Sequence, residues 1–126
     1  MTFKLKTLLI TVLTLAFLAG CSSVEDATIL AARDAVKQGA VIIDVRTPKE
    51  YKQGHVATAQ NIPIEVITKT LAPIPKGKEI VVYCASGNRS GTVANILRQN
   101  GWTVYDVATQ KDFEREITLP VEPQAK

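Results

Sequence analysis

The sequence lacks a long apolar run, carries almost no excess charge and contains only two cysteines, Cys21 and Cys84. Its most apolar stretch, residues 8–18, is too short to span a bilayer as a helix. The formal net charge is +3, and without Lys4 and Lys6, beside that stretch, 3 minus 2 leaves +1. So small an excess gives no support to a nucleic-acid partner.

The chain does contain enough apolar sequence for one globular domain. Of its 126 residues, 46% are hydrophobic and 21% are charged, which suits a single core and leaves no room for a second domain. We expect this domain to span residues 24–119, with residues 120–126 as a C-terminal tail on its surface. One domain must therefore contain the whole functional site.

The first twenty residues have the pattern of an export signal, with a positive end, an apolar run and small residues after it. They lead into Leu18-Ala19-Gly20-Cys21, which resembles the lipobox of bacterial lipoproteins. The resemblance implies that residues 1–20 are removed as a signal peptide and that Cys21 carries lipid. Residues 21–23 would then form the anchor and a short linker.

A lipid on Cys21 would tether the domain to a membrane and leave Cys84 without an intrachain partner. Ser22 stands where an Asp often retains lipoproteins at the inner membrane, which favours the outer membrane, facing the periplasm. The alternatives for Cys21 are a free thiol and a disulfide with Cys84. We therefore expect a lipid-anchored protein of the cell envelope.

Helical and extended patterns alternate along the rest of the chain, which is typical of an α/β domain with a parallel sheet. The run Val41-Ile42-Ile43-Asp44-Val45 is apolar enough for a strand covered on both faces. Thr47-Pro48-Lys49-Glu50 has the spacing of a capping box and predicts a short helix. The expected strands are residues 41–45, 79–83 and 102–107, with an extended piece at 60–62, and the expected helices are residues 24–38, 47–53, 65–71, 90–100 and 111–116.

Cys84 directly follows the strand that ends at Tyr83 and precedes the helix expected from Ser90. Its side chain should therefore emerge at the carboxyl edge of the sheet, where open α/β folds bind ligands. Gly87 permits the backbone angles that turn successive amides toward one anion, and Arg89 adds a permanent positive charge. Together with the helix N-terminus, these features favour the thiolate of Cys84 over the thiol.

A thiolate in such a loop can attack the outer sulfur of a donor such as thiosulfate, leaving a persulfide that passes its sulfur to an acceptor. The Ser90 hydroxyl can serve the site or cap the following helix. The alternative for Cys84 is a buried structural cysteine, since free cysteine is among the most buried residue types. The residues expected to bind substrate are Ala85, Ser86, Gly87, Asn88, Arg89 and Ser90.

The loop Cys84-Ala85-Ser86-Gly87-Asn88-Arg89-Ser90 resembles that of the rhodanese domain. Further matches extend the resemblance over residues 24–107. It implies a rhodanese-like α/β fold, with a five-stranded, largely parallel sheet and helices on both faces. It also implies a thiosulfate sulfurtransferase in which Cys84 carries sulfur, the loop amides and Arg89 bind the donor, and no metal or organic cofactor takes part. The further matches are Asp44-Val45-Arg46, Glu50-Tyr51, Gly54-His55-Val56 and Asn61-Ile62-Pro63.

Four residues of these motifs are expected to have structural roles near the site. By resemblance, the segment with Asp44 and Arg46 ties strand, loop and helix together, with Glu50 placed to pair with Arg46. The alternative for Asp44 and Arg46 is an acid and a cation acting in the site. His55, the only histidine, is expected to be hydrogen-bonded in a turn, and its alternative is a Cys–His pair.

The chain departs from the family at a few positions outside the loop. Thr58 stands where the family often has Gly, Ala108-Thr109-Gln110 replaces a common Gly-Gly, and Phe113 stands where Trp is frequent. These changes are expected to alter the rim of the site or the packing of the last helix. They affect substrate preference more than the class of reaction.

Two other functions are considered. Cysteine phosphatases and arsenate reductases place five residues between Cys and Arg, whereas four separate Cys84 from Arg89. No nearby Asp follows the loop as a general acid. An envelope sulfur carrier or binding module, with little turnover of its own, would use the same loop. The expected partners are a small-molecule sulfur donor, a thiophilic acceptor such as cyanide or a thiol, and the membrane.

Overall fold

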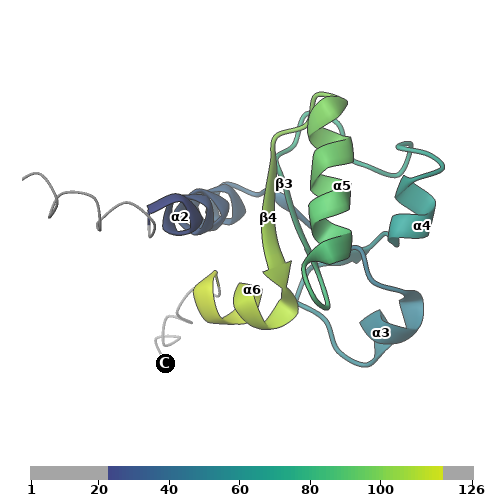
Figure 1. Cartoon of the computed structure of the whole chain (residues 1–126), viewed down its shortest axis with the longest axis horizontal. Helices are drawn as coiled ribbons and strands as arrows, with labels where there is room; N and C mark the ends of the chain where they lie inside the picture. The colour runs from purple at the N-terminus through teal and green to yellow at the C-terminus, as the bar shows by residue number, and fades with distance from the viewer. Residues whose placement is uncertain (1–22, 118–126) are drawn as a thin grey trace, which may run out of the picture.

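The β-branched runs of the sequence form a parallel sheet at the centre of the molecule (Figure 1). The computed structural model describes residues 23–117, and their four strands lie in the order β2-β1-β3-β4, with each neighbouring pair parallel. The two central strands are almost wholly buried because both of their faces are covered. The strands are β1 (Val41–Asp44), β2 (Gln60–Asn61), β3 (Ile80–Cys84) and β4 (Val104–Thr109).

Helices cover both faces of this sheet, as Figure 1 shows with α5 on one side and α2 on the other. Alternate residues of β3 enter two separate cores. Val82 and Cys84 belong to the core against α5, whereas Val81 and Tyr83 belong to the core that includes Phe113 of α6. The helices are α2 (Ser23–Lys37), α3 (Pro48–Lys52), α4 (Ile64–Ile67), α5 (Asn88–Gln99) and α6 (Gln110–Glu116).

The predicted class, a parallel α/β sheet flanked by helices, is confirmed, but the strand count is not. The resemblance implied five strands, and residues 23–117 form four. The segment before β1 forms helix α2, as its pattern predicted. The predicted signal peptide, Cys21 and the tail at 120–126 lie outside the described residues.

Two helices differ from their predicted bounds by two residues or more. Helix α5 starts at Asn88, two residues earlier than expected, because Gly87 enters it directly with a left-handed backbone (φ 90°). Helix α4 ends at Ile67 rather than at residue 71, ahead of the proline-containing link to β3. The loop after Cys84 is therefore tighter than the sequence suggested.

The predicted capping box is confirmed at the start of α3. The Thr47 hydroxyl accepts from the Glu50 amide at 3.3 Å, and the Glu50 carboxylate accepts from the Thr47 amide at 2.9 Å. Pro48 occupies the first helical position. This motif places Glu50 on the side of the molecule where β3 ends, which matters for the site described below.

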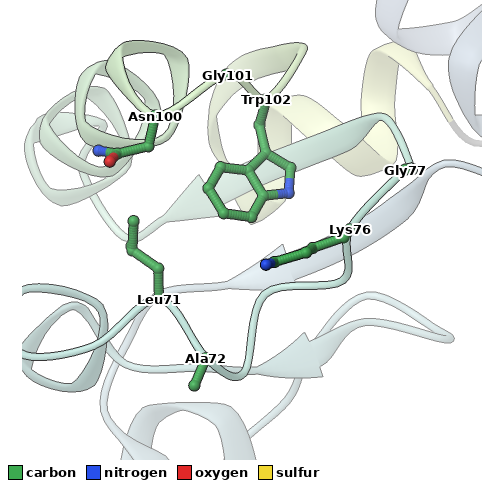
Figure 2. A pocket seen from close by; sticks show the side chains of 7 residues that line it. All are labelled: Leu71, Ala72, Lys76, Gly77, Asn100, Gly101 and Trp102. Atoms are coloured by element: carbon green, nitrogen blue, oxygen red, sulfur yellow. The ribbon is translucent and has the colours of Figure 1, made fainter.

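A hollow of about 510 Å³ lies at the opposite, amino end of β3 and β4 (Figure 2). Trp102 forms one of its walls and donates its indole N–H to the Pro75 carbonyl at 2.8 Å. This bond holds the link before β3 against the start of β4.

No helix within residues 23–117 has the length and apolar character needed to cross a membrane.

Candidate active site

Cys84 is the last residue of β3, and its whole surface is buried. Because β3 is central, this position lies at the carboxyl edge of the sheet, as predicted. The side chain belongs to the core on the α5 face, together with Val93. The loop that follows is different, because Ala85 and Ser86 are exposed. Buried sulfur thus lies directly under an exposed turn.

The turn directs polar groups at the sulfur. The Gly87 amide donates to Cys84 Sγ at 3.0 Å, and Ser90 Oγ lies 3.5 Å from the same atom. Burial is the largest influence on the pKa of Cys84 and raises it. The Ser90 hydroxyl and the amides of Ser90, Ser86 and Gly87 act in the opposite direction and outweigh burial, so the pKa lies below its ordinary value of 9.0. The loop therefore stabilises negative charge on sulfur.

Gly87 allows this turn to close against the end of β4. A Cβ on Gly87 would lie 3.2 Å from the Cβ of Ala108, in addition to the strain of a left-handed backbone. The fully buried Ser90 hydroxyl has one proton, which can go to the Gly87 carbonyl at 3.1 Å, to the Ala108 carbonyl at 3.4 Å or, when Cys84 is ionised, to its Sγ at 3.5 Å. The end of β4 is therefore the back wall of the cysteine loop.

Arg89, which was expected to add a positive charge to the loop and to bind the donor, is paired with a carboxylate. Its two terminal nitrogens donate to the two carboxylate oxygens of Glu50, at 2.8 and 2.9 Å. The sequence placed Glu50 beside Arg46 instead, and that expectation was wrong, because Arg46 is held by Asp44. A capping-box carboxylate on α3 thus reaches a guanidinium on α5, 39 residues away in the chain.

This ion pair fixes the charge of both partners. The hydrogen bond from Arg89, followed by the bonds from Thr47, holds the pKa of Glu50 far below its ordinary value of 4.5. The hydrogen bond to Glu50 is the largest cause of the raised pKa of Arg89, and the negative charges of Cys84 and Glu65 add to it. Arg89 therefore lies close enough to Cys84 to interact with the thiolate, although its hydrogen bonds go to Glu50.

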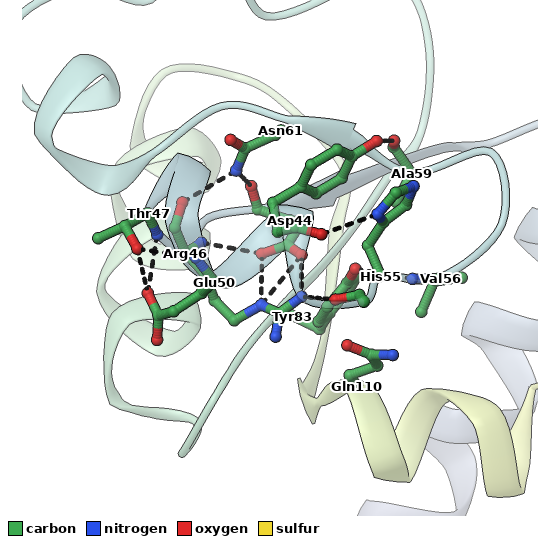
Figure 3. Close-up of polar contacts among 12 residues, drawn as sticks. Asp44, Arg46, Thr47, Glu50, His55, Val56, Ala59, Asn61, Tyr83 and Gln110 are labelled. Carbon is green, nitrogen blue, oxygen red and sulfur yellow. Dashed lines mark hydrogen bonds and ion pairs between the residues drawn. The ribbon is translucent and has the colours of Figure 1, made fainter.

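Asp44 and Arg46 form a framework beside the loop (Figure 3). Asp44 is fully buried and binds the Arg46 guanidinium at 2.6 Å, and Arg46 also donates to the Gly54 carbonyl at 2.7 Å. The guanidinium lies 5.6 Å from the centre of the Tyr83 ring. Removing one partner of such a buried pair typically costs about 3–5 kcal/mol, so these residues hold β1, β3 and the turn at Gly54 together.

His55 lies in the same framework and is directed at Tyr51 rather than at Cys84. Its Nδ1 is 2.9 Å from the Tyr51 carbonyl, and the two rings stack with their centroids 3.7 Å apart. The Tyr51 hydroxyl in turn donates to the Ala59 carbonyl at 2.7 Å. These contacts suit a role in the turn, and they offer no support for a Cys–His pair.

Two of the departures from the family fall where the backbone favours glycine. Thr58 has a φ of 67° and Ala108 a φ of 60°, both in the left-handed region. A side chain there typically costs about 1–2 kcal/mol, which is a physical reason for the glycines that the family resemblance led us to expect. The sequence analysis identified both positions, because each lacks a glycine that the family often has. Nothing in the sequence predicted the contact between Ala108 and Gly87.

The described residues offer no obvious metal centre. Between Ser23 and Ile117, no three His, Cys, Asp or Glu side chains gather as metal ligands would. Cys84 is a free thiol in this part of the chain. Its burial alone would fit a structural cysteine, but a structural cysteine in an apolar core does not need a backbone amide that donates to its sulfur, as Gly87 does here. The arrangement is suited to holding a sulfur anion.

Comparison with known proteins agrees with this geometry. The sequence pattern of the family described as "Rhodanese-like domain" matches residues 28–109, which is more than half of the chain. The chain belongs to this rhodanese-like family. The match contains the whole framework, the cysteine loop and β4, so the site lies entirely within the family domain.

The rhodanese-like chain has sulfurtransferases among its relatives. It is 35% identical over 77 residues to a sulfurtransferase of Allochromatium vinosum, which covers 61% of this chain and 72% of the relative. It is 41% identical over 63 residues to the thiosulfate sulfurtransferase PspE of Escherichia coli, which covers 48% of this chain and 61% of that one. The chain spans only 51% of the length of one further relative and 19% of the length of another.

Solved structures support the fold assignment. A rhodanese-related protein from Thermoplasma volcanium superposes with a TM-score of 0.56 at 29% identity, covering 68% of this chain and 88% of that one. A rhodanese with anions from Escherichia coli gives a TM-score of 0.53 at 35% identity, with coverages of 59% and 91%. The rhodanese-like fold is therefore shared with proteins of comparable domain size.

Proposed function

We propose that this rhodanese-like chain is a thiosulfate sulfurtransferase-type enzyme that carries sulfane sulfur on Cys84. The observation on which the proposal rests is the contact between the Gly87 amide and Cys84 Sγ at 3.0 Å, which accompanies a lowered pKa of the thiol. Sulfurtransferases among the relatives support the same class of reaction. Thiosulfate or a similar sulfane-sulfur donor is the proposed substrate, and cyanide or a thiol the acceptor.

The reaction follows from the groups around the sulfur. The Cys84 thiolate attacks the outer sulfur of thiosulfate, a new S–S bond forms, and the old S–S bond breaks with its electron pair leaving on sulfite. The amides of Ser86, Gly87 and Ser90, which favour the thiolate, also favour the anionic persulfide. A nucleophilic acceptor then takes the outer sulfur and returns Cys84 to the thiolate.

The simplest test compares the purified full-length chain with its Cys84→Ser variant. We expect thiocyanate to form from thiosulfate and cyanide with the native chain and not with the variant, because serine lacks the sulfur that accepts the transferred atom. Equal rates in the two proteins would show that Cys84 is not the carrier.

A sulfur carrier with little turnover is the second candidate, and the full burial of Cys84 favours it. A buried sulfur is reached more easily by a partner that displaces the exposed turn at Ala85 and Ser86. In this case a persulfide forms on Cys84, but thiocyanate production remains slow. The phosphatase alternative gains no support, because Glu50 already occupies the Arg89 guanidinium.

We further propose that the domain is anchored in the cell envelope through lipid on Cys21, facing the periplasm from the outer membrane. The Leu18-Ala19-Gly20-Cys21 pattern supports this placement. Mass spectrometry of the mature amino-terminal peptide tests it directly. An acylated Cys21 peptide is expected, and an unmodified terminal peptide would contradict the proposal.

A further inference from the structure

The Glu50–Arg89 pair changes what the mouth of the cysteine loop offers to a donor. Both carboxylate oxygens and both terminal guanidinium nitrogens are used, at 2.8 and 2.9 Å. Glu50 Oε2 accepts two more bonds, from the Thr47 amide at 2.9 Å and the Thr47 hydroxyl at 2.8 Å. The capping box therefore holds the Glu50 carboxylate in place at the start of α3, and Arg89 can leave the pair only by moving its own side chain.

The pair leaves no net charge where the sequence alone placed a positive one. Arg89 contributes one positive charge and Glu50 one negative charge, and the side chains remain 28% and 32% exposed at the rim. Glu65 adds a further negative charge close enough to raise the pKa of Arg89. What remains to hold an anion is the set of loop amides around Cys84.

Donors differ in how much negative charge they bring to this rim. Thiosulfate carries two negative charges, and it must approach the Cys84 thiolate beside an Arg89 whose positive charge Glu50 already balances. An organic persulfide, R–S–SH, is neutral or singly charged at its reacting end. Because the Glu50–Arg89 pair has no net charge, the uncompensated charges near the sulfur are those of the Cys84 thiolate and Glu65, and their repulsion disfavours thiosulfate relative to the persulfide.

We infer that Glu50 is a positioning residue that directs the site toward organic persulfides and away from thiosulfate, an inference that rests on the proposed sulfur transfer. The Cys84 thiolate attacks the outer sulfur of R–S–SH. The donor S–S bond breaks, its electron pair leaves on R–S⁻, and the proton stays on the transferred sulfur as Cys84–S–SH. No oxidant or reductant is consumed.

The test measures how fast Cys84 of the full-length chain is loaded by two donors in single turnover. The donors are thiosulfate and the persulfide of 2-mercaptoethanol, whose only ionisable group besides the hydroxyl is the reacting sulfur. Glu50→Gln removes the charge but keeps a side-chain oxygen for the Thr47 bonds. We expect the ratio of thiosulfate to persulfide loading rates to rise about five-fold or more in this variant.

The ratio separates a charge effect from simple loss of position, because a misplaced Arg89 would slow both donors alike. Glu79→Gln, at the other end of β3, changes the net charge equally and should leave the ratio unchanged. Raising the salt concentration should slow thiosulfate loading of Glu50→Gln more than that of the native chain, since its Arg89 is no longer paired.

A ratio that stays within about two-fold of the native value, with Cys84 still loading, would overturn the role of Glu50. So would an equal rise in Glu79→Gln. If neither donor loads the native chain, the proposed sulfur transfer itself fails, which is a different result. Each outcome thus supports or contradicts one identifiable step.

Discussion

Cys84 combines two properties that act against each other. Complete burial favours the neutral thiol, whereas the Gly87 amide and the Ser90 hydroxyl favour the thiolate. The pKa of Cys84 is lowered overall, so the Ser90 hydroxyl and the amides of Ser86, Gly87 and Ser90 together outweigh the loss of solvent. A core cysteine with ordinary apolar neighbours would show the opposite shift.

Ser90 should be the side chain that matters most for this balance. In Ser90→Ala the hydroxyl 3.5 Å from Cys84 Sγ is lost, so the pKa of Cys84 should rise toward its ordinary value. The rate of iodoacetamide alkylation, measured against pH, gives the midpoint. Because the alkylated species is the thiolate, the midpoint should move to higher pH.

Ser86→Ala is the matched control, because Ser86 acts on Cys84 through its backbone amide, which the substitution keeps. Its midpoint should equal that of the native chain. A common midpoint for all three proteins would show that the Ser90 hydroxyl has no part in stabilising the thiolate.

At the scale of elements, the site depends on how α5 begins against the end of β4. Gly87 starts α5 without a side chain because Ala108 occupies the adjacent space. A register irregularity between β3 and β4 falls at the same place, between Val82 and Cys84. The cysteine loop is therefore shaped by a strand end that is more than twenty residues further along the chain.

Gly87→Ala should destabilise the fold and distort the loop. The substitution costs about 1–2 kcal/mol for the left-handed backbone alone, and contact with Ala108 adds to this. Gly39→Ala is a suitable control, since Gly39 has the same φ of 90° but nothing within 4 Å of a new Cβ. Urea unfolding of both variants gives the two free energies.

We expect Gly87→Ala to lose more stability than Gly39→Ala and to load sulfur more slowly. Equal losses of unfolding free energy would mean that Ala108 moves aside for the new Cβ at no energetic cost. Unchanged loading would mean that the tight turn is not needed to position the amides.

Most elements were predictable because their signals are local. The apolar run at 41–45, the Thr47–Glu50 capping box and Gly87 each specify their own conformation. The Glu50–Arg89 pair and the Gly87–Ala108 contact were not predictable, because they join segments that only the completed sheet brings together. The fifth strand came from resemblance alone and was wrong for residues 23–117.

At the scale of the whole molecule, the Glu50–Arg89 pair links α3 to α5 and makes stability depend on pH. The pKa of Glu50 is lowered from 4.5 in the folded chain, so the pair stabilises the fold fully above that pH. As pH falls below about 4.5, the unfolded chain takes up the proton first, and this contribution is progressively lost.

Thermal unfolding between neutral pH and pH 3 tests this linkage. The native chain should be more stable than Glu50→Gln at neutral pH, because it has the intact pair. The difference in Tm should narrow as the solution becomes more acidic. A difference that stays constant over this range would show that ionised Glu50 does not stabilise the fold.

The central claim is that Cys84 carries the transferred sulfur, and the intact mass of the chain tests it most directly. After incubation with a sulfane-sulfur donor and removal of the excess, the native chain should gain the mass of one sulfur atom, located by peptide mapping on Cys84. Cyanide should remove that mass and release thiocyanate. No gain in mass, or the same gain in Cys84→Ser, would contradict the account.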